Sequence, residues 1–295
     1  MLVWKGLVEV MSPYECLPSK FFIGKNYIVV QQEDFVGLNV GYECGTWRYE
    51  SFADYLFKWL LQFGTKFSDL SKLDPANAMD MIKRAARMVY QSDRYKARGE
   101  FGELMLYAIL RELFGTQPVV SKLYYKSATN DTVKGFDAVH VRKNVEGNVE
   151  LWLGEVKFYK DVQSAINDVI SEIKCHLGRE KLKEEFMCVS AHVDDEWEFA
   201  PQVKALFDGN RSLDDIFRIV CIPVLLTYES PTVQSEQSIS DVFLTKLRDE
   251  LLQHYSTFSK KSSAIRLKVQ LILLPLDKKE QLLKVMDEKL KGLQR

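Results

Sequence analysis

The sequence predicts an α/β fold in which helices cover both faces of a central sheet. From Gly99 onward, apolar residues alternate between helical spacing and strand-like runs. The composition is that of a globular protein, with 46% hydrophobic and 27% charged residues, which excludes collagen-like, disordered and low-complexity chains. A chain of 295 residues can also bury a large core. Strands separated by helices of this length are typical of a sheet that is covered on both faces.

The N-terminal part is predicted to be an extension of the main domain. Residues 1–75 are expected to form a β-rich and helical extension, and 76–295 the α/β domain. The segment 51–63 predicts a helix, because its large apolar residues recur at helical spacing. A second helix is expected from Asp74-Pro75 to Val89, since proline is tolerated in the first turn.

The α/β part begins with an amphipathic helix over 100–114, which Gly115 ends. Two strands joined by a turn follow at 133–141 and 149–157, and 161–177 predicts a helix with one apolar face. The later expected elements are strands near 186–193, 216–227 and 265–274, helices near 241–254 and 277–290, and a polar loop over 229–240.

The charge balance and the cysteine pattern exclude some classes of protein. Forty basic residues against forty-one acidic ones give a net charge of −1, which rules out a polycation that wraps nucleic acid but not a local basic face. Five scattered cysteines without a Cys-x-x-Cys pair, and four histidines, argue against structural zinc and for reduced thiols. Because no signal-like leader or bilayer-length apolar stretch is present, we expect a cytoplasmic protein without membrane association.

The candidate chemistry lies in the paired strands. The first begins Gly-Phe-Asp137-Ala-Val-His, and the second ends Leu-Gly-Glu155-Val-Lys157. Because side chains alternate along a strand, Glu155 and Lys157 share one face, and the neighbouring strand can bring Asp137 to the same place. Two adjacent carboxylates repel each other unless a divalent cation lies between them, and oxygen ligands suit Mg²⁺ or Mn²⁺. Beside such an ion, Lys157 could hold or deprotonate the attacking water and offset phosphate charge.

A single acid-x-Lys triplet carries little information. Glu172-Ile-Lys174, Asp277-Lys-Lys279 and Asp287-Glu-Lys289 have the same form and are expected on solvated helix faces. The alternative without a catalytic role is that Glu155 and Lys157 form a surface pair between strands. The indication of a site comes from the ordered set: an acid on a helix, an Asp in an apolar strand, a turn, and Gly-Glu-Val-Lys at the end of a second strand.

That order, over residues 99–177, resembles the PD-(D/E)xK nuclease superfamily, with Phe136 where the usual proline would stand. The resemblance implies a restriction-endonuclease-like fold, with a central mixed sheet flanked by helices. It also implies that Asp137, Glu155 and the backbone carbonyl of Val156 are metal ligands and that Lys157 activates the water.

The resemblance further implies an acid on the preceding helix, which begins Gly99-Glu100-Phe-Gly-Glu103-Leu. We favour Glu103, because a shorter run separates it from the helix-ending Gly115. Glu100, three residues earlier, lies on nearly the same face and stays an alternative.

Over most of its length the chain also resembles the HamA family, the nuclease effector subunits of the Hachiman antiphage defence system. The similarity is sharpest in Lys134-Gly-Phe-Asp-Ala-Val-His and in Trp152-Leu-Gly-Glu-Val-Lys-Phe-Tyr-Lys160. It implies a metal-dependent DNA endonuclease that uses Mg²⁺ or Mn²⁺. It also implies a large, HamB-like helicase subunit as the partner that holds the nuclease in check.

Basic residues that precede the helix expected over 100–114 are candidates for binding DNA through its phosphates. The expected contacts are Arg84, Arg87, Arg94, Lys96 and Arg98, with Lys160 beyond the strand motif. The alternative is a solvated face or a surface that docks on an acidic partner. That alternative is favoured for the segment 122–126, where cations and tyrosines lie side by side. Separately, His140 is expected to be packed or exposed rather than a metal ligand.

The sequence lacks the motifs of ATP hydrolysis and of serine-hydrolase catalysis. The sequence contains no phosphate-binding Gly-x-x-x-x-Gly-Lys-[Ser/Thr] loop, so the chain itself should not hydrolyse ATP, and no Gly-x-Ser-x-Gly elbow. Two alternatives to the defence nuclease remain. One is a catalytically silent adaptor with a nuclease-like fold. The other is a stand-alone restriction-type nuclease in which residues 1–98 read DNA sequence.

Overall fold

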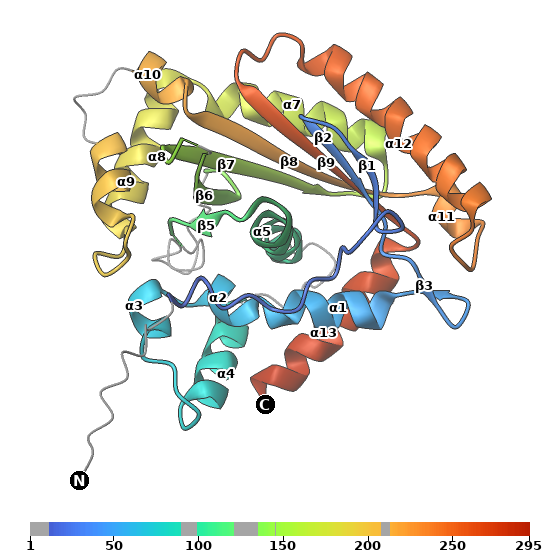
Figure 1. Cartoon of the computed structure of the whole chain (residues 1–295), viewed down its shortest axis with the longest axis horizontal. Helices are drawn as coiled ribbons and strands as arrows, with labels where there is room; N and C mark the ends of the chain where they lie inside the picture. The colour runs from blue at the N-terminus through green and yellow to red at the C-terminus, as the bar shows by residue number, and fades with distance from the viewer. Residues whose placement is uncertain (1–11, 90–98, 121–134, 145, 208–212) are drawn as a thin grey trace.

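A central mixed sheet organises the protein (Figure 1). The computed structural model describes residues 12–89, 99–120, 135–144, 146–207 and 213–295. In these ranges seven strands pair in the order β1-β2-β9-β8-β7-β6-β5. Strands β2, β9, β8 and β7 run parallel to one another, whereas β1 at one edge and β6 and β5 at the other pair antiparallel. Their bounds are β1 Ile28–Gln31, β2 Phe35–Leu38, β5 Gln117–Pro118, β6 Ala138–Lys143, β7 Val149–Phe158, β8 Val220–Glu229 and β9 Lys268–Leu276.

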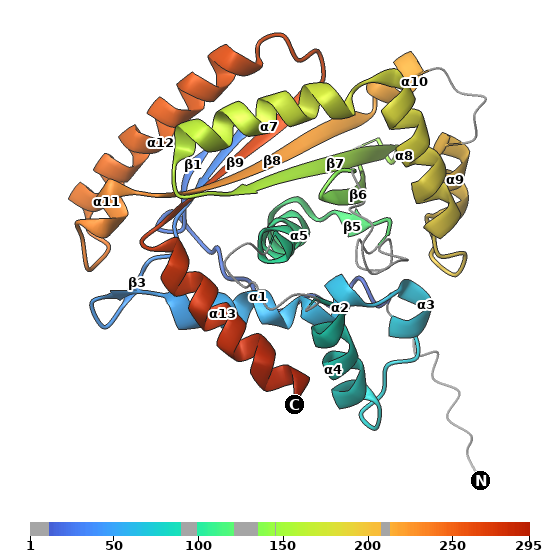
Figure 2. The same ribbon diagram turned by 180° about the vertical axis from the view of Figure 1, so that it is seen from behind.

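Helices cover both faces of this sheet, as the sequence predicts (Figures 1 and 2). Helices α7 (Val162–His176) and α12 (Asp241–Ser262) lie on one face. Helix α5 (Glu100–Phe114) lies on the other, with α1 (Tyr49–Lys58) and α13 (Lys279–Gln294) outside it. The remaining elements are β3 Tyr42–Glu43, β4 Thr46–Trp47, α2 Leu60–Gly64, α3 Phe67–Leu70, α4 Ala78–Val89, α8 Arg179–His192, α9 Ala200–Phe207, α10 Leu213–Phe217 and α11 Pro231–Gln234.

Helix α5 is buried on all its sides, although its sequence predicts a single apolar face. Every residue from Phe101 to Arg111 is buried, because the sheet covers one side of the helix and the layer of α1 and α2 covers the other. Gly115 ends the helix in the left-handed conformation, with φ 61°. The helix therefore sits as the middle layer between the sheet and the outer helices.

The N-terminal and C-terminal parts of the chain meet in the sheet. Strand β2 pairs in parallel with β9, where Phe35 lies opposite Leu271, and β1 extends the same edge. The division of the chain at residue 75 stays a prediction. None of the helices within the described ranges combines the length and the apolar character that a bilayer crossing needs.

The expected strand at 186–193 is wrong, because residues 186–192 belong to helix α8 and Val193 is its C-cap. The buried residues Leu182, Phe186, Val189 and Val193 are spaced by four, three and four, which is a helical period. The expected loop at 229–240 contains the short helix α11, which Ser230 caps by accepting the amide of Val233. The expected helix at 51–63 is divided into α1 and α2 at Trp59.

Candidate active site

The pairing of β6 with β7 brings the two strand acids together. Ala138 lies opposite Gly154, so Asp137, directly before β6 begins, is next to Glu155. The Asp137 amide donates to the Gly154 carbonyl at 2.8 Å, and its Oδ2 accepts the amide of Val156 at 2.9 Å. The Asp137 carboxylate thus takes the place of a strand carbonyl just before β6 begins. Because the N–H and C=O of one strand residue point to the same side, the Val156 carbonyl is directed toward Asp137 as well.

The two faces of β7 have different partners. A Cβ atom on Gly154 would lie 2.9 Å from Leu106 of α5, and one on Gly102 of α5 would lie 3.2 Å from Val156. The even-numbered positions therefore face α5. Glu155 and Lys157 point the other way, toward α7, where each meets a side chain of that helix. The common face expected for Glu155 and Lys157 is therefore observed, but α7 covers it.

Glu155 is paired with a histidine that the sequence did not single out. Its Oε1 lies 2.6 Å from Nδ1 of His176, and the Glu155 side chain is 1% exposed. Burial raises the pKa of Glu155; the hydrogen bond to His176 opposes that rise, and the charge of Asp137 adds to it. The hydrogen bond to Glu155 also raises the pKa of His176. Both shifts favour a proton held between the two side chains.

Lys157 forms an ion pair with Glu172 of α7. Burial lowers the pKa of Lys157, but the hydrogen bond and charge of Glu172 outweigh it, and Glu155 and Asp137 act in the same direction, so the pKa of Lys157 is raised. Lys157 is therefore an ammonium ion, which favours a role as a positive charge over a role as a base. The expectation that Glu172 lies on a solvated helix face is wrong, because it reaches back to the sheet.

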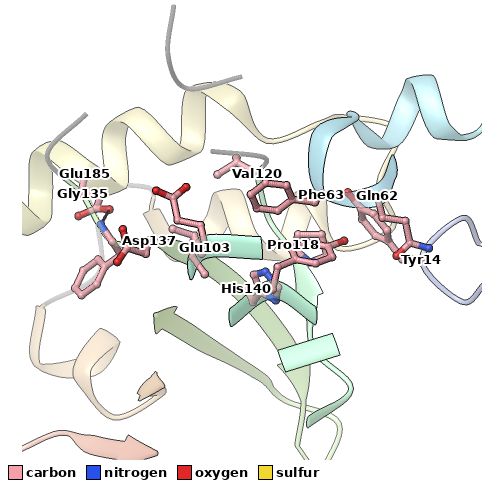
Figure 3. A pocket seen from close by; sticks show the side chains of 14 residues that line it. Tyr14, Gln62, Phe63, Glu103, Pro118, Val120, Gly135, Asp137, His140 and Glu185 are labelled. Carbon is pink, nitrogen blue, oxygen red and sulfur yellow. Dashed lines mark hydrogen bonds between the residues drawn. The ribbon is translucent and has the colours of Figure 1, made fainter. Parts of the chain in front are cut away.

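Glu103, rather than Glu100, lies beside Asp137. Glu103 and Asp137 line one pocket of about 570 Å³, part of it open to solvent, and Figure 3 shows them side by side. Glu100 is not among the described residues that line this pocket. Away from the acids the pocket continues along Phe63, Pro118 and other apolar or aromatic side chains. The role of Glu103 as the helix acid stays a prediction.

A further acid reaches the site from helix α8. Oε1 of Glu185 accepts the amide of Phe136 at 2.7 Å, directly before Asp137 (Figure 3). The Phe136 ring packs edge-on against His176, with ring centroids 5.1 Å apart. Sequence reasoning missed Glu172, His176 and Glu185. One signal was available for the first two: their four-residue spacing on a helix matches the two-residue spacing of Glu155 and Lys157 on a strand.

The oxygen atoms of Asp137, Glu155 and Val156 fit a hard divalent cation. Within the described residues no three His, Cys, Asp or Glu side chains gather closely enough to hold a metal ion by themselves. Mg²⁺, however, is usually bound by one or two carboxylates and keeps several waters. Asp137, Glu155 and the Val156 carbonyl supply such a set of oxygen atoms. The charge of Asp137, which raises the pKa of buried Glu155, is a repulsion that a cation would relieve.

Of the expected DNA-binding cations, the structure describes Arg84, Arg87 and Lys160. Arg84 and Arg87 are exposed on α4, which lies outside α2 on the side away from the sheet (Figures 1 and 2). Lys160 pairs with Glu280 at 2.9 Å and with Glu229 at 3.9 Å. Arg94, Lys96, Arg98 and the segment 122–126 lie outside the described residues. His140 is packed in the core, where its Nδ1 lies 2.8 Å from the hydroxyl of Thr116.

The mixed sheet flanked by helices, with Asp137 directly before β6 and with Glu155 and Lys157 on β7, is that of a nuclease-like α/β protein. The chain belongs to the HamA family, whose sequence profile matches residues 21–290. It is therefore a Hachiman defence-related protein, and HamA is one subunit of a multi-subunit defence system. Neither the curated proteins nor the solved structures gave a match to this chain.

Proposed function

We propose that the chain is a metal-dependent DNA endonuclease, the effector of an antiphage defence system, and that a helicase subunit holds it in check. One observation carries the proposal. The β6–β7 pair places Asp137 against the backbone of Val156, with Glu155 and Lys157 on the adjoining positions of one strand face. The charges of Asp137 and Glu155 both act on Lys157, so the three groups form one electrostatic unit.

Asp137, Glu155 and the Val156 carbonyl would hold Mg²⁺ or Mn²⁺. When bound, such an ion supplies Lewis-acid chemistry: it lowers the pKa of a bound water and stabilises charge on the phosphate. Lys157, kept as an ammonium, offsets negative charge on the scissile phosphate. Glu103, which lines the pocket beside Asp137, would orient the attacking water.

The charge balance around the site supports a metal requirement. Asp137, Glu155, Glu172 and Glu185 lie around Lys157 and His176, so the acids outnumber the bases. A phosphodiester approaching this cluster meets repulsion until a divalent cation is present. Cleavage should therefore depend on added metal rather than only being accelerated by it.

The test is cleavage of supercoiled plasmid by the purified protein with Mg²⁺ or Mn²⁺. Wild type is expected to nick or linearise the plasmid, and EDTA, Lys157→Ala and Asp137→Asn to abolish cutting. Lys174→Ala is the matched control, because Lys174 is exposed on the same helix that contacts Lys157. If both site variants cut as fast as wild type, the proposed site is wrong. An RNA substrate in parallel decides between DNA and RNA.

The helicase partner needs a separate test. We expect a helicase to co-purify with the chain from its native host and to suppress cutting when added back. The expected phosphate contacts at Arg84, Arg87 and Lys160 also stay predictions. If they are correct, each contact should add to the salt dependence of DNA binding.

A catalytically silent adaptor is the second candidate, and one observation favours it. Both motif side chains on β7 are engaged by α7, Glu155 by His176 and Lys157 by Glu172. Calorimetry with Mn²⁺ distinguishes the two functions. A nuclease should take up Mn²⁺ in a way that requires Asp137, whereas an adaptor should show no such uptake.

A further inference from the structure

Helix α7 contacts the strand motif through two residues in register. Glu172 and His176 are four residues apart on α7, and their partners Lys157 and Glu155 are two residues apart on β7. Four helical residues rise about 6 Å, and two strand residues span about 6.6 Å, so both pairs form at once. The helix begins at a cap in which Asp161 accepts the amide of Ser164, only three residues after β7 ends. This short connection fixes which turn of α7 faces the motif.

The His176 ring is held from two sides. Its Nδ1 lies 2.6 Å from Oε1 of Glu155, and the Phe136 ring packs edge-on against it. His176 is itself buried. The ring therefore has one orientation, and the hydrogen bond turns Oε1 of Glu155 toward α7. This fixes the rotation of the carboxylate about its own axis.

We infer that His176 is a positioning residue, whose Nδ1–H fixes the Glu155 carboxylate so that its second oxygen is presented to a divalent cation. The inference rests on the proposed function, because it assumes a cation at Asp137 and Glu155. The physical reason is that a metal-binding carboxylate with a free rotation loses orientational entropy on binding. Loss of such outer hydrogen bonds typically weakens metal affinity by about 10- to 100-fold.

The test is titration of the full chain with Mn²⁺ by calorimetry, with two substitutions that separate the donor from the packing. His176→Leu keeps an apolar side chain and loses the donor. His176→Asn places an amide N–H near the position of Nδ1. We expect the Leu variant to bind Mn²⁺ about 10-fold more weakly or worse and the Asn variant to keep most of the affinity. His254→Leu, a half-buried histidine of α12 that packs on Tyr228, is the matched control and should bind like wild type.

Cleavage supplies an independent readout. His176→Leu should raise the Mn²⁺ concentration needed for half-maximal cleavage, while the rate at saturating Mn²⁺ stays near that of wild type. The inference is overturned if the Leu variant binds Mn²⁺ as tightly as wild type, or if the Asn and Leu variants lose affinity equally.

The Asp137→Asn variant separates a failure of the proposed metal site from a failure of the positioning role of His176. If it loses Mn²⁺ uptake while His176→Leu does not, the positioning role is wrong and the metal site stands. If wild type shows no Mn²⁺ uptake that depends on Asp137, the metal site and the positioning role both fall.

Discussion

Lys157 on β7 and Glu172 on α7 form an ion pair that links this inner strand of the sheet to the helix covering it. Their side chains are 14% and 38% exposed, so solvent screens the lysine end poorly and the glutamate end better. The pair keeps the ammonium of Lys157 on the α7 side of the strand. A phosphate that recruits this ammonium must therefore compete with the Glu172 carboxylate.

Glu172→Gln should lower the pKa of Lys157. Burial favours the neutral amine, and the hydrogen bond and charge of Glu172 overcome it in the wild-type chain. Removal of that carboxylate leaves burial opposed only by the weaker effects of Glu155 and Asp137. The measurement is an NMR titration of the Lys157 side chain. Glu180→Gln, on the exposed first turn of α8, should leave the titration unchanged. An unaltered Lys157 pKa in the Glu172 variant would contradict the prediction.

His140 should make the protein sensitive to acid. Burial, assisted by the charge of Arg111, lowers the pKa of His140 to about 3. Below pH 6.5 the unfolded chain binds a proton at this residue and the folded chain does not, so the free energy of unfolding falls as the pH drops. The slope for one proton is about 1.4 kcal/mol per pH unit, and it continues until the pH approaches the folded pKa.

The check is urea unfolding of His140→Asn between pH 6.5 and 4.5. Its free energy of unfolding should fall less steeply with pH than that of wild type. An Asn amide can still reach the Thr116 hydroxyl, so the comparison isolates the titration. His192→Asn serves as control, because His192 is exposed at the end of α8, and it should follow the wild-type slope. Equal slopes for wild type and the His140 variant would refute the assignment.

Gly102 sets the distance between α5 and β7. A Cβ atom there would meet Val156 at 3.2 Å and the Cβ of Phe158 at 3.3 Å, both on the strand that carries the motif. Gly102→Leu should therefore push the helix away from the sheet and destabilise the fold by about 1–3 kcal/mol. Thermal unfolding measures the loss.

Gly292 provides the matched comparison for Gly102. It also lies on a helix, α13, but a Cβ atom there would have nothing within 4 Å. Gly292→Leu should leave stability unchanged or increase it, by up to about 1 kcal/mol, because leucine favours helix over glycine. If both substitutions have the same effect, close packing is not what requires glycine at 102.

Asp137→Ala should loosen the end of the β6–β7 pair, and Asp137→Asn should not. The amide of Val156 donates to Oδ2 of Asp137, and an Asn carbonyl oxygen can accept the same bond. Loss of the acceptor costs about 1–3 kcal/mol where the donor is left buried. Hydrogen exchange at Val156 reports it directly: we expect faster exchange in the Ala variant only. Equal protection in both variants would show that the carboxylate does not close the strand.

The paired strands and their shared face were predictable because strand periodicity and turn residues are local signals. The wrong strand at 186–193 shows the limit of that approach, since Phe186, Val189 and Val193 fit a short apolar strand as well as a helix. The roles of Glu172 and His176 were not predictable from their own neighbours. Each depends on how α7 docks against β7, and a side chain on a solvated helix face has the same local sequence.

Helix α5 has no solvent side on which to give way, since the sheet and the outer helices enclose it from Phe101 to Arg111. The outer helices therefore pack directly on the helix whose first turn carries Glu103. A second subunit bound to α1 or α13 would therefore be separated from the pocket only by α5, and it would not need to enter the pocket to affect it.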